Sequence, residues 1–321
     1  MTEQLSTGGL LCVGETMALM TSRTVGPLAQ APELTVSVGG AEGNVAIGAR
    51  RLGVRTTWAG RLGADSFGDR VERELRAEGV LTWITRDHAA PTGVMVKERR
   101  TVGTSRVWYY RDGSAGGRLA PEDVPADLIA SADLVHLTGI TPGLSPSALA
   151  AVRSIVAVAT AARTPISFDV NHRTAVWADR DPGPVYRELV AAAAIMFAGE
   201  DEARLAVGID QTDRERLLGA LAALTDGDVV LKLGADGCLA RIGGDELEQD
   251  AVPVEVRDTV GAGDAFVAGY LAELLAGATP DQRLRTAVRC GAFACLTDGD
   301  WEGNPTRAEL ALLDSKEPVV R

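Results

Sequence analysis

The chain has 321 residues, of which 46% are hydrophobic and 24% are charged, and its formal net charge is −12. Such a composition is typical of a globular protein with enough apolar material for a large core, in one or two domains. The acidic balance argues against nucleic acid or an anionic membrane as the main partner. An anionic substrate would therefore have to be held by a local cationic pocket.

The cysteines and the N-terminal residues indicate neither a metal centre nor export. The cysteines have no CxxC spacing and lie in apolar segments, which is typical of buried thiols in a reducing compartment; they are Cys12, Cys238, Cys290 and Cys295. The N-terminus lacks a charged region followed by an apolar core, and no run approaches the ~18 apolar residues of a membrane span. We expect a soluble, cytoplasmic protein.

Short apolar runs alternate with helical patterns in the first part of the chain. We expect strands at 10–13 and 56–59, and helices at 44–52 and 67–78, of which the last stops at Gly79.

The same alternation returns in the middle of the chain. We expect strands at 133–137, 166–170, 194–198 and 228–233, with Ala-rich helices at 146–163 and 184–193 between them. Strands that alternate with helices predict an α/β fold with a doubly wound, mostly parallel sheet. In such folds, ligands bind beyond the carboxyl ends of the strands.

Residues 92–110 break this alternation, because they read as two β-rich runs around a turn at 102–104 with no helix to cover one face. Together with parts of 15–38, the segment 91–111 is predicted to form a small antiparallel lid on the main sheet. No repeat or linker is visible, so we expect a single domain, 1–321, that carries this lid. Exposed sheet edges often pair with another subunit, and we therefore expect a homo-oligomer.

The stretch DTVGAGDAFVAGY at 258–270 carries the most chemistry. Gly261, Ala262 and Gly263 have little or no side chain, so the backbone there can approach a charged ligand. The apolar run 265–275 predicts a buried helix, whose first turn has unpaired N–H groups and a positive dipole end that suit a phosphate. If Asp264 only capped the helix, its charge would repel that anion. Its position is better explained if it is a base that takes a proton from a hydroxyl. The alternative is a Gly-rich turn that simply starts a helix.

With Asp258 and Thr259 before the glycines and Ala268 and Gly269 after them, this stretch completes the second signature of the ribokinase-like (PfkB) sugar kinases. The chain resembles that family over nearly its full length, and within it is most similar to the 2-dehydro-3-deoxygluconokinase branch. The segments that carry the resemblance are GGAEGNVAIGARRLG at 39–53, GRLGADSFG at 60–68, PTGVMVKE at 91–98, YYRDGSAGGRLAPEDV at 109–124, HLTGITPGLS at 136–145, FDVNHRTAVW at 168–177, KLGADG at 232–237 and GDWEGNPTRAEL at 299–310. Glu42 replaces the small residue or Pro that is usual in the family, a departure that this branch shares.

The resemblance implies a kinase that uses ATP and Mg2+, in which Asp264 deprotonates the 6-hydroxyl of the sugar and the amides of 261–263 stabilise the transferring phosphoryl group. The implied substrate-binding residues are Gly39, Gly40, Asn44, Met95, Tyr109, Arg111 and Arg173. The two arginines favour a 2-keto sugar acid such as 2-keto-3-deoxygluconate, because a guanidinium binds a carboxylate bidentately and a neutral hexose needs none. Met95 stands where the family usually has an aromatic residue.

On the nucleotide side, the resemblance implies that the ATP-binding residues are Gly199, Lys232, Gly234, Asp236, Gly237, Gly261 and Gly263. Glu202 matches the acidic end of the NxxE element of the family, which organises magnesium through water, and Gly199 replaces its Asn. The alternative for Glu202 is a solvated acidic loop. Asp258 and Thr259 match residues that bind a monovalent cation such as K+ in relatives, with a structural cap as the alternative.

Three other functions stay open at this point. A ribokinase-like kinase for fructose, ribose, tagatose phosphate or a nucleoside would need no arginine pair. A non-catalytic sensor of sugar acids or nucleotides would not need the base at Asp264. A Rossmann dehydrogenase is disfavoured, because the first strand is followed by Gly14–Glu15–Thr16 and no GxGxxG. His136 and His172 lack spaced partners, and we expect both to be structural.

Overall fold

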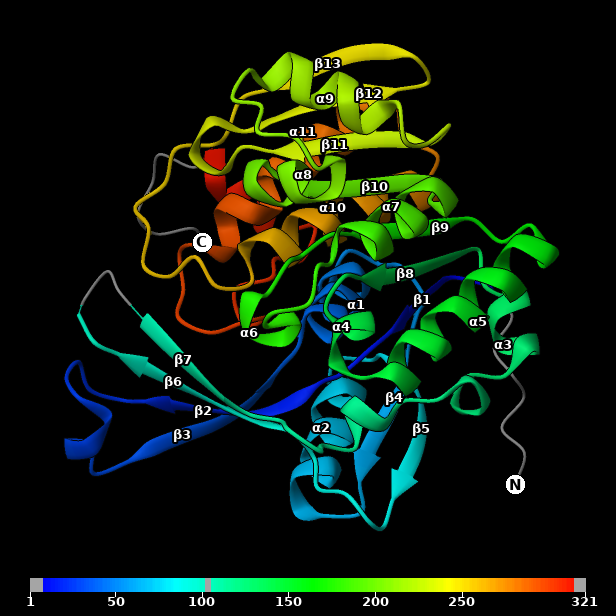
Figure 1. Cartoon of the computed structure of the whole chain (residues 1–321). Helices are drawn as coiled ribbons and strands as arrows, with labels where there is room; N and C mark the ends of the chain where they lie inside the picture. The colour runs from blue at the N-terminus through cyan, green and yellow to red at the C-terminus, as the bar shows by residue number, and fades with distance from the viewer. Residues whose placement is uncertain (1–7, 102–104, 315–321) are drawn as a thin grey trace.

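The computed structural model describes residues 8–101 and 105–314, and it contains a large sheet with helices on both faces and a small sheet that projects from it (Figure 1). The strands of the large sheet are β1 (Leu10–Val13), β4 (Thr56–Gly63), β5 (Leu81–Asp87), β8 (Leu134–Thr138), β9 (Ile166–Asp169), β10 (Ile195–Gly199), β11 (Asp228–Lys232), β12 (Cys238–Ile242) and β13 (Asp245–Gln249). Their order across the sheet is β13-β12-β11-β10-β9-β8-β1-β4-β5.

From β11 to β5 every neighbouring pair of strands is parallel, and at the other edge β12 is antiparallel to both of its neighbours, β11 and β13. This confirms the predicted doubly wound, mostly parallel sheet. The hairpin of β12 and β13 was not predicted, because the charged run of β13 shows no apolar alternation. Its turn is Gly243–Gly244, and both residues have positive φ angles, which suits a tight two-residue hairpin.

The helices divide between the two faces of the large sheet. One face is covered by α1 (Ala41–Arg51), α2 (Ser66–Ala77), α10 (Ala262–Leu275) and α11 (Pro280–Ala294). The other is covered by α3 (Ala126–Ala130), α5 (Pro146–Ala162), α7 (Gly183–Ala192), α8 (Glu200–Val207) and α9 (Arg214–Ala222). Within β10, Phe197 packs on Phe266 and Tyr270 of α10, whereas Met196 joins the core of the opposite face. Because both faces are buried, the strands read as continuous apolar runs.

Two helices that carry site residues begin earlier than the sequence predicts. The predicted helix at 44–52 starts at Ala41, and the predicted helix at 265–275 starts at Ala262. Both starts lie in short runs of Gly and Ala, which have no apolar periodicity to mark a helix. As a result, Asn44 is the fourth residue of α1 rather than its first, and Asp264 lies inside the first turn of α10 rather than before it.

The small sheet forms the predicted lid. Its strands are β2 (Met17–Ser22), β3 (Leu34–Gly39), β6 (Val94–Arg99) and β7 (Ser105–Tyr110), in the order β3-β2-β6-β7. The two outer pairs are antiparallel, and the central pair β2–β6 is parallel. The predicted turn at 102–104 lies outside the described residues. One face of the lid carries a small apolar cluster of Met17, Leu19, Met95 and Val107.

No helix within 8–101 and 105–314 combines the length and the apolar character that crossing a membrane requires.

Candidate functional site

The side chain of Asp264 is held at both of its oxygens by asparagine amides. Nδ2 of Asn44, in α1, donates to Oδ2 over 2.8 Å, and Nδ2 of Asn171, in the loop after β9, donates to Oδ1 over 3.2 Å. Asp264 itself lies in the first turn of α10 and is buried. Three elements that are far apart in the sequence therefore fix the direction in which this carboxylate points.

The surroundings of Asp264 place it in the range of a general base. Burial raises the pKa of Asp264 from 3.8 to about 6, while the Asn44 hydrogen bond and the positive charges of Arg173 and Lys232 lower this pKa and the charge of Asp169 raises it. Such a group is mostly ionised at pH 7, yet it binds a proton more readily than an exposed carboxylate does. This combination suits a residue that takes a proton during a reaction.

The turn before Asp264 requires glycine at its first position. Gly261 caps α10 in the left-handed conformation, with φ 78°, and a Cβ added there would lie 1.8 Å from the carbonyl oxygen of Asp300. Gly263 is exposed, and the nearest side-chain atom to a Cβ placed on it is Nζ of Lys232, at 3.8 Å. The predicted anion loop, Gly261 to Gly263, thus lies at the N-terminus of a helix and next to an ammonium group.

Lys232 joins the end of β11 to the end of β9. Its Nζ donates to both carboxylate oxygens of Asp169, over 2.8 and 2.7 Å. Burial alone would lower the pKa of Lys232, but the charges of Asp169, Glu202 and Asp264 outweigh it and raise that pKa. Lys232 is therefore a fixed positive charge between the anion loop and the nucleotide-side residues.

Part of the predicted nucleotide site lines one cavity of about 820 Å³, next to the loop after β9. The predicted residues that line it are Gly199, Glu202, Lys232 and Gly234. Asp236 and Gly237 follow in the same turn but do not line this cavity. The Asp236 carboxylate accepts a 2.7 Å hydrogen bond from Arg214, and a Cβ on Gly237 would lie 2.0 Å from the carbonyl oxygen of Gln249.

Glu202 has a clear local role in the structure. Its Oε2 accepts the N–H of Gly199 over 2.6 Å, and its Oε1 accepts the N–H of His172 over 3.0 Å. The carboxylate therefore caps α8 and ties it to the loop after β9. In the described part of the chain, no three His, Cys, Asp or Glu side chains gather as ligands for a metal ion. A divalent ion at this site would take most of its ligands from a phosphate and from water, which is usual for Mg2+.

The predicted substrate loop, Gly39 and Gly40, packs closely under the lid. A Cβ on Gly39 would lie 2.3 Å from Cε of Met95 and 2.5 Å from Oδ2 of Asp300, and one on Gly40 would lie 2.3 Å from the carbonyl oxygen of Glu15. The backbone contact excludes a larger residue at Gly40, whereas at Gly39 the ends of the two side chains would have to move. Met95, a buried lid residue, therefore forms the wall directly above the loop that precedes Asn44.

Tyr109 and Arg111 enter the site from the last lid strand. Tyr109 stands opposite Met95 in the register of β6 and β7, and the guanidinium of Arg111 lies 5.6 Å from the centre of the tyrosine ring. Both residues line a cavity of about 650 Å³ between the lid and the helices α4 (Thr141–Leu144) and α6 (Thr174–Trp177). Arg111 also forms an ion pair with Glu15, which accepts the hydroxyl of Ser114 over 2.5 Å as well.

Arg173 differs from Arg111 in its partners. Its side chain is exposed and its Nη1 donates to the carbonyl of His172 over 3.1 Å, and across 8–101 and 105–314 no carboxylate lies within ion-pair distance of it. Its charge nevertheless acts on Asp264. Among the described residues, no carboxylate forms an ion pair with Arg173, whereas Arg111 pairs with Glu15.

Three residues of the site were missed. They are Asn171, which holds Asp264; Asp300, which lies against Gly39 and Gly261; and Glu15, which pairs with Arg111. Asn171 and Asp300 belong to the segments FDVNHRTAVW and GDWEGNPTRAEL, so the resemblance pointed to their neighbourhood. Only the folded chain brings them to the carboxylate and the loop that they contact.

His136 and His172 make hydrogen bonds inside the protein. Nδ1 of His136 lies 3.0 Å from the hydroxyl of Ser167, and burial lowers the pKa of His136 to about 3. Nδ1 of His172 lies 2.8 Å from the hydroxyl of Tyr186. Both contacts agree with structural roles.

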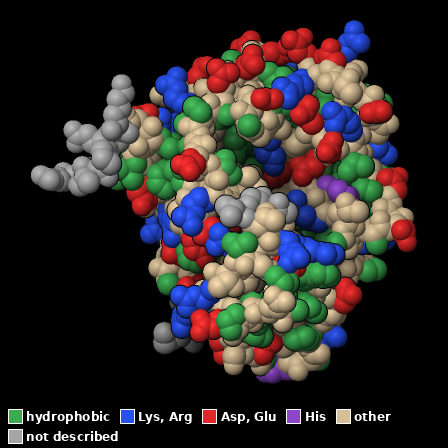
Figure 2. All heavy atoms as spheres, turned by 90° about the vertical axis from the view of Figure 1, so that its left-hand side faces the viewer, with side chains coloured by type: hydrophobic (Ala, Val, Ile, Leu, Met, Phe, Trp, Pro, Cys, Tyr) green, Lys and Arg blue, Asp and Glu red, His purple; other side chains and the backbone are tan. Residues whose placement is uncertain are grey.

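The surface of the molecule is hollowed on the side that carries the lid. Figure 2 shows a depression near the middle of this face, with Lys and Arg side chains beside it and mostly acidic side chains above it. An anionic ligand in this depression would meet cationic side chains within a surface that is acidic overall.

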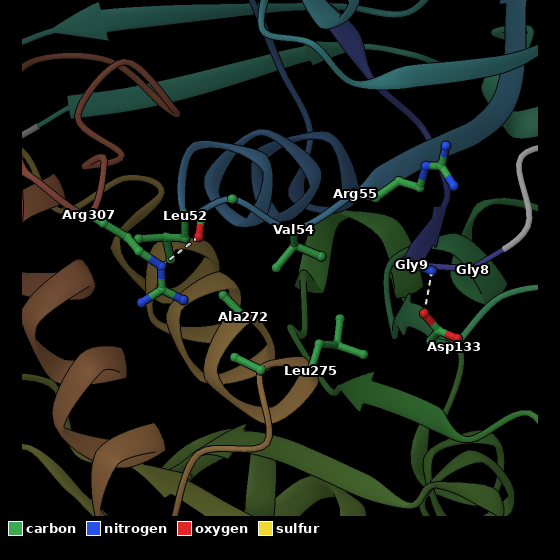
Figure 3. A pocket seen from close by; sticks show the side chains of 11 residues that line it. Gly8, Gly9, Leu52, Val54, Arg55, Asp133, Ala272, Leu275 and Arg307 are labelled. Carbon is green, nitrogen blue, oxygen red and sulfur yellow. Dashed lines mark hydrogen bonds between the residues drawn. The ribbon is translucent and has the colours of Figure 1, made fainter.

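A third cavity, of about 510 Å³, lies at the opposite ends of the strands (Figure 3). Gly9, Arg55 and Asp133, which precede β1, β4 and β8, line it together with residues from the C-terminal ends of α1 and α10. None of the predicted site residues lines it. Gly199, Lys232 and Gly234, by contrast, line their cavity at the carboxyl ends of β10 and β11, where ligands bind in doubly wound folds.

Comparisons with known proteins identify the family of the chain. The model of the family described as "pfkB family carbohydrate kinase" matches residues 8–307. A 2-dehydro-3-deoxygluconokinase of Thermoproteus tenax is 36% identical over 94% of this chain and 92% of its own length, and a 2-dehydro-3-deoxygalactonokinase of Haloferax volcanii is 31% identical over 92% and 93%. A crystal structure of a PfkB protein from Polaromonas sp. superposes with a TM-score of 0.85 at 31% identity, over 95% of this chain and 99% of that one. The chain therefore belongs to the pfkB family of carbohydrate kinases, enzymes that transfer a phosphoryl group to a sugar hydroxyl.

Proposed function

We propose that this kinase uses ATP to phosphorylate the 6-hydroxyl of 2-keto-3-deoxygluconate or a close 2-keto sugar acid, with Asp264 as the general base. The observation that carries the substrate class is the charge of Arg173, which is near enough to lower the pKa of Asp264 and has no carboxylate partner within the described residues. A sugar acid would supply that partner.

The chemical step follows from the geometry around Asp264. The carboxylate takes the proton of the sugar hydroxyl, the hydroxyl oxygen forms a bond to the γ-phosphorus of ATP, and the bond from that phosphorus to the β-phosphate oxygen breaks to release ADP. A positioned base contributes about 10²–10⁴ in rate. The amides of Gly261, Ala262 and Gly263 and the ammonium of Lys232 stabilise charge on the transferring group, and one such donor is typically worth roughly 3–4 kcal/mol.

ATP would occupy the cavity that Gly199, Lys232 and Gly234 line, with its γ-phosphate toward the N-terminus of α10. Mg2+ bound with it would neutralise charge on the β- and γ-phosphates. Glu202 lines the same cavity and would meet that ion through water, since its oxygens already accept backbone N–H groups. Asp236 and Gly237 would shape the turn rather than contact the nucleotide.

The carboxylate of the sugar acid would lie between the lid and the loop after β9. Arg173 would bind it directly, and Arg111, held in place by Glu15, would complete the clamp with Tyr109. Gly39, Gly40, Asn44 and Met95 would contact the sugar chain. The names of the two relatives differ only in the aldonate, gluconate or galactonate, which supports the sugar-acid class and leaves the epimer to be measured.

The test is ATP-coupled turnover of the full chain on 2-keto-3-deoxygluconate, its galactose-derived epimer, gluconate, fructose and ribose. Asp264→Ala should abolish turnover, and Arg173→Ala should raise KM for the sugar acid far more than it lowers kcat. Arg285→Ala, at an exposed position in α11, is the matched control and should leave both constants unchanged. If fructose or ribose is the best substrate and Arg173→Ala has no effect, the chain is a kinase for a neutral sugar. If no compound is turned over, a sensor becomes the better description.

We also propose that the protein is a homo-oligomer that associates through the lid. Strands β3 and β7 are the free edges of the small sheet, and Trp108 and Tyr110 of β7 are 39% and 66% exposed. Sedimentation of the wild type and of Tyr110→Lys tests this. A wild type that sediments as a monomer at every concentration would exclude it.

A further inference from the structure

Lys97 is a buried cation that connects the lid to the segment before α10. It lies on β6, its side chain is 2% exposed, and its Nζ forms an ion pair and a hydrogen bond with Asp258. The same Nζ lies 3.8 Å from Oδ1 of Asp300. A lysine is almost never this buried without a charged partner. Here two carboxylates, from two other parts of the chain, surround one ammonium group.

Both carboxylates adjoin the loop that is proposed to hold the phosphoryl group. Oδ1 of Asp258 accepts the N–H of Val260 over 3.1 Å, one residue before that loop. The main chain of Asp300 packs against Gly261, and its Oδ2 lies next to Gly39. Negative charges at these positions would repel an incoming phosphate, and poor solvent screening at a buried site strengthens that repulsion.

The charge of Lys97 has no evident substitute at this position. Burial raises the pKa of Asp300 to about 7, Lys97 lowers it, and the nearby acidic residues Glu302, Asp264 and Asp258 raise it. Among the described residues, no hydrogen-bond donor reaches the buried Oδ1 of Asp300. The carboxylates at this point therefore outnumber the cations, and Lys97 provides the compensation.

We propose that Lys97 is a positioning residue for phosphoryl transfer, whose ammonium group neutralises Asp258 and Asp300 behind the loop Gly261–Gly263. Because Lys97 belongs to a lid strand, the electrostatic state of this loop depends on the lid being docked. The inference rests on the proposed function, since it assumes that the loop holds the transferring phosphate. Asp258 is also the residue that the resemblance associates with a monovalent cation, and its Oδ2 is engaged by this lysine.

The test compares Lys97→Met with the double variant Lys97→Met/Asp258→Asn, in the full chain and with the best sugar of the panel. Lys97→Met leaves the carboxylates uncompensated and should lower kcat by about tenfold or more, with a weaker affinity for ATP. The double variant removes one carboxylate as well and should recover kcat at least about threefold over Lys97→Met, because double-variant cycles report a direct coupling.

A purely structural lysine would give the opposite pattern. The double variant would then lose a second buried contact and be no more active than Lys97→Met, which would overturn the proposal. It would also be overturned if Lys97→Met kept the wild-type kcat. Thermal melting of each variant, with Asp258→Asn alone as the control, separates loss of fold from loss of charge.

If Lys97→Met does not fold, the double variant decides alone. Turnover within about tenfold of the wild type supports charge compensation, and a larger loss in a folded protein overturns it. ATP affinity measured by calorimetry without sugar keeps this test separate from the substrate proposal. A wild type that binds ATP but turns over no sugar contradicts the proposed function, whereas a Lys97→Met variant with unchanged ATP affinity and kcat contradicts only the role of Lys97.

Discussion

Oδ2 of Asp264 accepts a 2.8 Å hydrogen bond from Nδ2 of Asn44, a residue 220 positions earlier in the chain. Asn44 is the fourth residue of α1, the helix that follows Gly40. The proposed base is therefore oriented by the helix that comes directly after Gly39 and Gly40, and Met95 of the lid packs beside Gly39. Two of the residues proposed to contact the substrate, Gly39 and Gly40, thus lie close in the chain to the residue that orients the base.

Replacement of Asn44 by Ala should move the acid limb of the pH–rate profile to higher pH. The Asn44 hydrogen bond lowers the pKa of Asp264, so its loss leaves a pKa above about 6 and a smaller fraction of ionised base at pH 6 to 7. The measurement is kcat/KM from pH 5 to 9 for the wild type and the variant. Asn304→Ala is a useful comparison, since Asn304 contacts only the main chain of Asn44. A lower rate with an unshifted limb would show that Asn44 acts on the sugar alone.

Replacement of Asp264 by Asn should abolish turnover and yet stabilise the fold near pH 7. Burial raises the pKa of Asp264 in the folded chain from 3.8 to about 6, so the folded state holds a proton that the unfolded state releases. The unfolding free energy therefore decreases as pH rises from about 4 to 6, and at most about 3 kcal/mol is recovered when the charge is removed. Urea melts at pH 5 and pH 7.5 measure this. Asp250→Asn, at an exposed position after β13, should melt like the wild type at both.

Replacement of Gly261 by Ala should cost far more than replacement of Gly277, although both glycines have similar positive φ angles of 78° and 74°. An added Cβ at Gly261 would lie 1.8 Å from the carbonyl oxygen of Asp300, whereas at Gly277 it would meet nothing within 4 Å. Backbone strain alone costs about 1 kcal/mol, which sets the expected effect at Gly277. Gly261→Ala should in addition displace the loop and lower kcat by about 10² or more. Equal melting temperatures and rates for the two variants would contradict this geometry.

Replacement of Glu42 by Gln should remove part of the pH dependence of stability. Burial raises the pKa of Glu42 from 4.5 to about 7, the hydroxyls of Thr138 and Thr141 lower it through hydrogen bonds, and the charge of Asp264 raises it. The folded state therefore binds a proton that the unfolded state loses, and the contribution falls as pH rises from about 4.5 to 7. The free energy of unfolding of Glu42→Gln, relative to that of the wild type, should increase by up to about 3 kcal/mol between pH 5 and pH 8. Denaturant melts at both values check it, and an unchanged difference would show that Glu42 is ionised throughout.

The fold was largely predictable because the strands of a covered parallel sheet are apolar on both faces. Residues 10–13, 166–170 and 194–198 carry that signal, and each strand appears within one residue of its expected bounds. Helix starts in Gly- and Ala-rich runs carried no such signal. The hairpin at Gly243–Gly244 escaped notice since its second strand is charged on an exposed edge.

The sequence indicates site residues that belong to a motif. It does not indicate contacts between side chains that lie far apart in the chain. The glycines before Asp264 point to an anion loop from the sequence alone. The pairing of Arg111 with Glu15, 96 residues apart, depends on how the lid folds back, and no local pattern encodes it. No local pattern encodes the contact of Asn171 either. The resemblance singled out Arg173, two residues later, but the side-chain amide of Asn171 is the group that donates to Asp264.

The position of Lys97 on a lid strand would affect how fast the enzyme hydrolyses ATP when no sugar is bound. If β6 moved away together with the lid, the ammonium of Lys97 would leave Asp258 and Asp300 uncompensated beside the anion loop. A γ-phosphate bound in that open state would be poorly stabilised for transfer. Its hydrolysis by water that enters the site would therefore be slow. Docking of the lid, which a bound sugar would favour through the proposed contacts with Tyr109 and Arg111, would restore the charge at the moment an acceptor hydroxyl is present. The lid strand would thus act as a safeguard against futile hydrolysis.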